Sequence, residues 1–223
     1  MKAYEFHFVE VWKALPYLTE GAALTIGISF LAMLGGLVVG LALALASQTR
    51  WRLVRWLVVA YVEAFRNTPL LIQIFFLYFG LPLVLVKLPA FGSGLLALTL
   101  YGAAYNCEVV RAGLEAVPHG QHEAARSTGL TPWQEARYVI VPQALRISFP
   151  ALGNNLVSLV KNSSLVSAIG MVELMFVAND ISFNNFRSFE IYGAAVAYYM
   201  VLVLGLSRLL ALTERRVLAK SVA

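Results

Sequence analysis

The chain has 223 residues, of which 60% are hydrophobic and only 13% are charged. Soluble domains are typically about 45–50% apolar and about 25% charged, so the composition excludes an ordinary soluble domain and indicates a membrane protein. The net charge of +5 does not point to nucleic acid, because the arginines stand at the ends of apolar segments, as they do in membrane proteins. The single cysteine, Cys107, excludes an intrachain disulfide, and no cysteine–histidine spacing suggests a metal site.

The first element is the segment of residues 1–18. Three glutamates interrupt the apolar residues of the first twenty positions, so the segment lacks the unbroken apolar core of a secretory signal. Two structures fit it: a short interfacial helix that lies on the membrane surface, anchored by Trp12 and Tyr17, or a frayed tail.

Five apolar segments follow, each able to cross a bilayer, which takes about 20 helical residues. They are predicted at about 22–46, 56–86, 94–110 with an extension toward 117, 149–171 and 191–212. Residues 172–189 mix apolar and polar side chains and are predicted as a half-embedded helix followed by a loop. The expected fold is therefore an all-α integral membrane protein of about five transmembrane helices.

The lysines and arginines predict how these spans are oriented. Eleven of them lie between the first and second spans, between the third and fourth, and after the fifth, whereas four lie in the segments on the opposite side. Cytoplasmic loops carry the excess of basic residues. The N-terminus is therefore expected outside and the C-terminus inside.

A polar segment between the third and fourth spans is the most informative part of the chain. Pro118 and Gly120 end the preceding helix, and a short helix is predicted over 121–128. Gly129 follows it, and glycine is the residue that ends a helix in the left-handed conformation without penalty.

A second short helix is expected to start directly after this bend. Thr131 suits the cap, Pro132 the first helical position, and Gln134 completes a capping box. This helix is predicted to end near Pro142. The two short helices form a rigid cytoplasmic projection that a separate motor can push, although a solvated connector is the plainer alternative.

The spacing of residues in this segment resembles the EAA motif of ATP-binding-cassette (ABC) importer permeases. In that motif Glu-Ala-Ala is followed after three residues by Gly, and after nine more by Ile, any residue and Leu-Pro. Val139 and Val141 replace the Ile and Leu conservatively. The resemblance implies a coupling helix that docks on an ATPase, with coupling residues Glu123, Ala124, Ala125, Arg126, Gly129 and Pro142.

Three further runs are similar to those of polar amino-acid permeases of this superfamily, the group of histidine, glutamine, arginine and glutamate importers. They are 65–70 (FRNTPL), 104–113 (AYNCEVVRAG) and 159–165 (LVKNSSL). The similarity covers about 18–215, so it implies a type I permease domain over 19–215, after an interfacial segment of residues 1–18 and before a cytoplasmic tail of residues 216–223.

Polar groups inside the spans are the candidates for a substrate path. An ionisable residue at the centre of a membrane helix costs about 2.5–3.5 kcal/mol on insertion scales, so it is expected to face the protein interior. Glu63 and Arg66 are spaced to pair on one helix, and Lys161 could bind a substrate carboxylate or only neutralise Glu63 or Glu108. The candidate path residues are Arg66, Asn67, Thr68, Glu108, Asn154, Asn155, Ser158, Lys161, Asn162 and Ser163.

The chain contains no Gly-x-x-x-x-Gly-Lys-Ser/Thr phosphate loop, so it is not the ATPase. The resemblance implies a pore subunit that is not an enzyme and has no cofactor of its own, because ATP-Mg binds to the partner. The implied partners are two ATPase subunits, a second permease subunit (identical or different), an extracytoplasmic solute-binding protein and membrane lipid, all at a bacterial inner membrane.

Two other classes of protein make predictions that differ from this interpretation. A secondary transporter or channel predicts paired membrane carboxylates or inverted repeats of hydropathy, and neither is visible. An intramembrane enzyme predicts a nucleophile and base in the spans, and Cys107 has no base partner that the sequence reveals.

Overall fold

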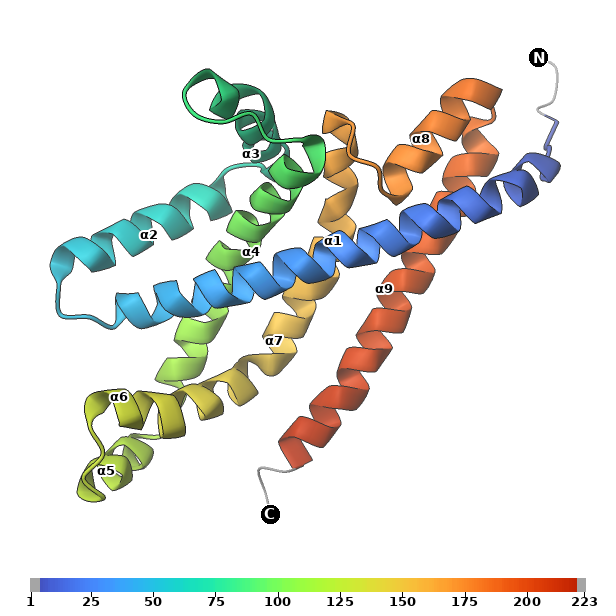
Figure 1. The fold of residues 1–223 in the computed structure, drawn as a ribbon. Coiled ribbons are helices and arrows are strands. Elements are labelled where there is room, and N and C mark those ends of the chain that lie inside the picture. The colour runs from blue at the N-terminus through green and yellow to red at the C-terminus, as the bar shows by residue number, and fades with distance from the viewer. Residues whose placement is uncertain (1–4, 220–223) are drawn as a thin grey trace.

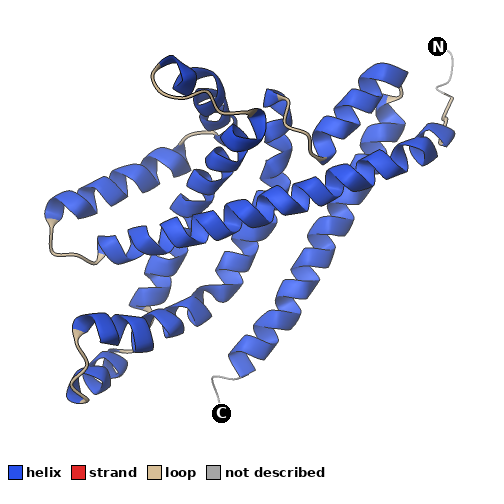
Figure 2. Ribbon diagram, viewed as in Figure 1, coloured by secondary structure: helices blue, strands red, loops and turns tan. Residues whose placement is uncertain are grey.

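The computed structural model describes residues 5–219, and every regular element among them is helical (Figures 1 and 2). Parts of the predicted N-terminal segment and C-terminal tail, residues 1–4 and 220–223, lie outside the described residues. The elements are α1 (Val9–Ser47), α2 (Arg52–Asn67), α3 (Leu70–Phe75), η1 (Phe76–Gly80), η2 (Leu81–Leu83), α4 (Ala90–Glu115), α5 (His119–Ser127), α6 (Pro132–Glu135), η3 (Ala136–Ile140), α7 (Val141–Asn162), η4 (Ser163–Ile169), α8 (Leu174–Asn185) and α9 (Ser188–Ala219).

Helix α1 runs unbroken from Val9 to Ser47 and crosses the whole molecule in Figure 1. A short interfacial helix or a frayed tail was predicted for residues 1–18, but α1 passes residue 18 without a boundary. The reason is tertiary: Ala14, Leu18 and Ala22 lie one turn apart on one face and are buried against α8 and α9. Packing therefore extends the helix through residues whose sequence alone predicts a surface segment.

The core forms where α1 crosses α4. Gly36 and Gly40 lie against the backbone of α4, and a Cβ atom built on Gly40 would stand 2.8 Å from the Cβ of Asn106. Small residues allow this close approach of two membrane helices. Ile28, Leu98 and Leu159, each almost fully buried, continue the core toward α7.

The predicted span over 56–86 is not one helix. Helices α2 and the Leu70–Leu83 run meet at an angle of 108° at Thr68 and Pro69. Proline lacks the amide hydrogen that the helix ladder needs. The side chain of Gln73 satisfies the carbonyls freed by the break, because its Nε2 donates to the oxygens of Phe65 (2.8 Å) and Thr68 (2.9 Å).

The second helix of the polar segment does not end near Pro142, as had been predicted. It continues through η3 and α7 to Ile169 in one run that begins at Pro132. The π-helical turn η3 widens the backbone just before Pro142, which then occupies the first turn of α7, where a missing amide hydrogen is tolerated. Gly170, with φ of 76°, ends the run, and α8 leaves it at 47°.

A helix and a loop were predicted for 172–189, and α8 followed by the turn at Phe186 confirms both. Buried Glu173 caps α8 by accepting from the amide of Phe176 (2.8 Å). The same carboxylate accepts from the hydroxyls of Thr25 on α1 (3.2 Å) and Tyr199 on α9 (2.9 Å). One side chain thus ties three helices together at this end of the molecule.

Two helices in the described part of the chain, α1 and α9, are long and apolar enough to cross a membrane. The number rises to four if each bent pair, α2 with Leu70–Leu83 and Pro132–Ile169 with α8, is one span. Helix α4 is long enough for a fifth span but carries glycines, Asn106 and three charged residues near its end. An all-helical protein with several candidate spans is therefore confirmed.

Candidate functional site

The short helix α5 ends in the way its sequence predicted. Gly129 has a φ of 80°, its amide donates to Arg126 O (3.0 Å), and the amide of Leu130 donates to Ala125 O (3.4 Å). These two bonds form a Schellman motif, which satisfies the last carbonyls of a helix. The bend between α5 and α6 is therefore fixed by the backbone.

The start of α6 is fixed as well. The side chain of Thr131 accepts from the amide of Gln134, whose own side chain accepts from the amide of Thr131 (2.9 Å). This is the predicted capping box, with Pro132 in the first turn. Helices α5 and α6 form a compact projection at one end of the molecule (Figure 1, lower left).

The coupling residues predicted on α5 do not all face outward. Glu123 and Ala124 are exposed, but Ala125 is 5% exposed and packs inward. Ala125 therefore contacts the rest of the projection. Arg126 pairs with Glu135 of this chain (3.1 Å), and its side chain remains 71% exposed.

Glu135 and His122 belong to this site but were missed in the sequence. The Glu135 carboxylate is buried, lies 2.7 Å from His122 Nδ1 and accepts from Arg126 Nε at 3.1 Å. The hydrogen bond to His122, and after it the one to Arg126, holds the pKa of the Glu135 carboxyl below its usual range. The carboxylate therefore stays charged and keeps both partners.

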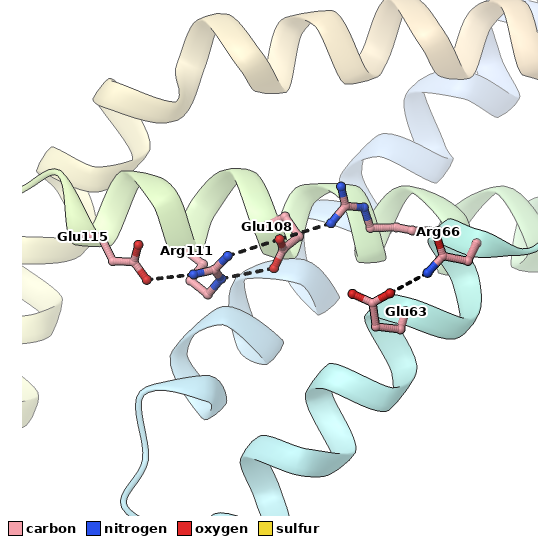
Figure 3. A network of polar contacts seen from close by, with 6 residues as sticks. Glu63, Arg66, Glu108, Arg111 and Glu115 are labelled. Atoms are coloured by element: carbon pink, nitrogen blue, oxygen red, sulfur yellow. Dashed lines mark hydrogen bonds and ion pairs between the residues drawn. The ribbon is translucent and has the colours of Figure 1, made fainter.

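A row of charges links α2 to α4 (Figure 3). Arg66 donates to Glu108 (3.1 Å), and Arg111 donates to both Glu108 (3.1 Å) and Glu115 (2.8 Å). The predicted pairing of Arg66 with Glu63 is wrong, because Glu63 instead accepts from Asn67 one turn further along α2.

Two tyrosines extend this row along α4. The Arg66 guanidinium lies 5.4 Å from the centre of the Tyr105 ring, a cation–π distance. The ring of Tyr101 lies 4.6 Å from that of Tyr105. Neither these tyrosines nor Arg111 had been singled out in the sequence as site residues. Their common signal is helical spacing: Tyr105 and Arg111 each lie three residues from Glu108, and Tyr101 lies four residues before Tyr105.

The polar residues predicted for the substrate path differ in how far they are buried. Asn155 is half-buried and donates a hydrogen bond to Asn106 of α4 (3.0 Å). Ser163 is fully buried, and its hydroxyl donates to Val160 O. Both side chains are therefore used in contacts within the protein. Asn154 and Lys161 are exposed, and Lys161 forms no ion pair with any described residue. The remaining members of the set are half-buried Ser158 and Asn162 and, at the helix break, exposed Asn67 and Thr68.

The chain matches the family "Binding-protein-dependent transport system inner membrane component" over residues 36–219. It is 40% identical over 188 residues to the probable glutamine ABC transporter permease protein GlnM of Bacillus subtilis (84% of this chain, 87% of that one). It is 35% identical over 214 residues to the glutamine transport system permease protein GlnP of Escherichia coli K12 (95% and 98%).

Solved structures give the same result. The chain superposes on the crystal structure of an amino acid ABC transporter with histidines at a TM-score of 0.87, with 39% identity over 96% of this chain and all of that one. The inward-facing MetNI methionine ABC transporter shares the fold, with a TM-score of 0.79 at 22% identity over 91% of this chain and 97% of that one. The chain therefore belongs to the family of binding-protein-dependent transport system inner membrane components.

Proposed function

We propose that this chain is the membrane subunit of an ATP-driven importer of polar amino acids, with glutamine as the first substrate to test. The observation that carries the proposal is the projection formed by α5 and α6, in which the Glu-Ala-Ala and Gly frame ends in a Schellman motif and a capping box. Relatives named as glutamine permeases support the substrate class.

The proposed assembly contains two ATPase subunits that bind ATP-Mg, a second permease subunit and an extracytoplasmic binding protein, in a bacterial inner membrane. Five spans with the N-terminus outside and the C-terminus inside suit the fold. Figure 1 draws the α1–α2 connection together with α5 and α6 toward one side of the molecule, and the N-terminus with the α8–α9 connection toward the other.

In the proposed cycle, closure of the two ATPases moves α5, and the movement passes through the Pro132–Ile169 run to the polar face of α7. The pore opens outward, receives the amino acid from the binding protein and opens inward after hydrolysis. Such a cycle needs contacts that differ between the two states. Exposed Glu123, Ala124 and Arg126 are among the residues of α5 that the ATPase would reach.

The test is uptake into proteoliposomes that hold this permease, its ATPase and its binding protein. ATP-dependent accumulation of glutamine is expected, and it should stop when ATP is replaced by a non-hydrolysable analogue or when the binding protein is left out. Uptake that continues without ATP or without the ATPase would instead show a secondary transporter.

Lys161 is the proposed contact for the substrate carboxylate, because it is exposed on α7 and forms no ion pair within the described residues. A hydrogen bond to a charged group contributes about 1.5–3 kcal/mol, so Lys161→Gln should lower uptake roughly tenfold or more, while Lys161→Arg keeps most of it. Arg146→Gln, exposed on the same helix, is the matched control. Wild-type uptake by Lys161→Gln would exclude the contact.

A further inference from the structure

One buried carboxylate contacts helix α5 at two residues. Glu135 is 6% exposed, and its two oxygens are divided between two residues of α5: Oε1 lies 2.7 Å from His122 Nδ1, and Oε2 accepts from Arg126 Nε at 3.1 Å. His122 and Arg126 are four residues apart, so they lie one turn from each other on the same face of α5. The two contacts therefore fix both the position of α5 and its rotation about its own axis.

The helix run that carries Glu135 is also part of a candidate membrane span. Pro132 begins this run and Ile169 ends it, with no break in between. On its other side α5 is joined to α4 only through the turn at Ala116–Pro118. A displacement of α5 is thus transmitted more directly to α7 than to α4.

A cavity of about 600 Å³ lies behind α5. Its walls include His119, His122, Arg126 and Glu135, the end of α4 at Glu115, and Gln48 at the end of α1. The apolar contact of α5 is made by Ala125, which is 5% exposed, and the cavity leaves the rest of this side of the helix without packed side chains. Apart from the Glu135 contacts, exposed Gln121 accepts from half-buried Gln143 of α7 (3.1 Å).

We propose that Glu135 is a positioning residue that locks α5 to the Pro132–Ile169 run, so that movement of α5 becomes movement of α7. The proposal rests on the proposed function in one respect, namely that α5 receives the push of an ATPase. It assigns the transmission of force to three residues, His122, Arg126 and Glu135.

The experiment measures the distance between α5 and α7 in the complete complex in nanodiscs. Spin labels are attached through Ser127→Cys on α5 and Ile147→Cys on α7, both exposed, in a Cys107→Ala background that removes the single native cysteine. A narrow distance distribution between the labels is expected, and Glu135→Gln should broaden it. Arg137→Gln, exposed on η3 and in no ion pair within the described residues, should leave it narrow.

Two further variants keep the carboxylate and remove its partners. His122→Gln and Arg126→Gln should each leave one contact and a nearly normal distance distribution, whereas the double variant should match Glu135→Gln. If Glu135→Gln does not assemble, the double variant decides the question. A double variant with a narrow distribution and wild-type uptake would overturn the proposal.

Transport supplies the second readout. Mutations along coupling networks weaken the coupling between two sites, so glutamine uptake per ATP hydrolysed should fall about tenfold in Glu135→Gln, with the ATPase still bound. An unchanged ratio would contradict a role in force transmission. If the wild type imports nothing, the proposed function fails, while the label distances still test the lock.

Discussion

Replacing Gly40 by valine is expected to destabilise the folded permease strongly. A Cβ at this position would stand 2.8 Å from the Cβ of Asn106, 2.9 Å from Ala103 O and 2.9 Å from the amide nitrogen of Cys107. Two of these neighbours are backbone atoms of α4, which cannot rotate away as a flexible side chain can. Overpacking of this kind typically costs about 1–3 kcal/mol and occasionally more, and here the two central helices must separate.

The measurement is the thermal stability of the purified permease in detergent, together with its yield from membranes. Gly27→Val is the matched control, because Gly27 lies on the same helix and a Cβ there meets nothing within 4 Å. Gly27→Val should behave as the wild type, whereas Gly40→Val should melt well below it or fail to accumulate. Equal stability of the two variants would show that α1 and α4 do not pack as described.

The features that were predicted correctly from the sequence are set by neighbours in the chain. The cap at Thr131, the capping box with Gln134 and the left-handed Gly129 each depend on residues within three or four positions. The sequence therefore located the projection of α5 and α6 and described its bend without knowledge of the rest of the fold.

The features that were missed depend on contacts distant in sequence. Helix α1 begins at Val9, earlier than predicted, because one face of its first turns packs on α8 and α9. The helix through Pro142 continues because η3 widens the turn before that residue. Both outcomes are decided by tertiary packing or by a local irregularity that hydropathy does not reveal.

The same distinction explains the candidate site. Glu63 lies three residues from Arg66, so the sequence predicted an ion pair between them. In the structure Arg66 instead forms its ion pair with Glu108 of α4. Glu135 lies thirteen residues from His122 across a tight bend, so no helical spacing joins them. Charge pairs within one helix can be proposed from spacing, whereas pairs between helices need the fold.

Substitutions at Gly129 are expected to uncouple the transporter in an order set by the backbone and not by side-chain size. Gly129 has a φ of 80°, and a Cβ there meets nothing within 4 Å, so a side chain fits but the conformation opposes it. The left-handed conformation costs an ordinary residue about 1–2 kcal/mol, less for Asn and Asp, and it is rarest for β-branched residues. ATP-dependent uptake should therefore fall least in Gly129→Asn, more in Gly129→Ala and most in Gly129→Val.

Gly120 provides the control for this series. It lies within α5, a Cβ there also meets nothing within 4 Å, and its φ is not left-handed. Gly120→Val places the same side chain in the first turn of α5, without the backbone strain, and should retain most uptake. A cost of about 2 kcal/mol corresponds to roughly a thirtyfold change in an equilibrium, so the two valine variants should differ clearly. Equal loss in both would mean that bulk near the ATPase, and not the angle between α5 and α6, limits transport.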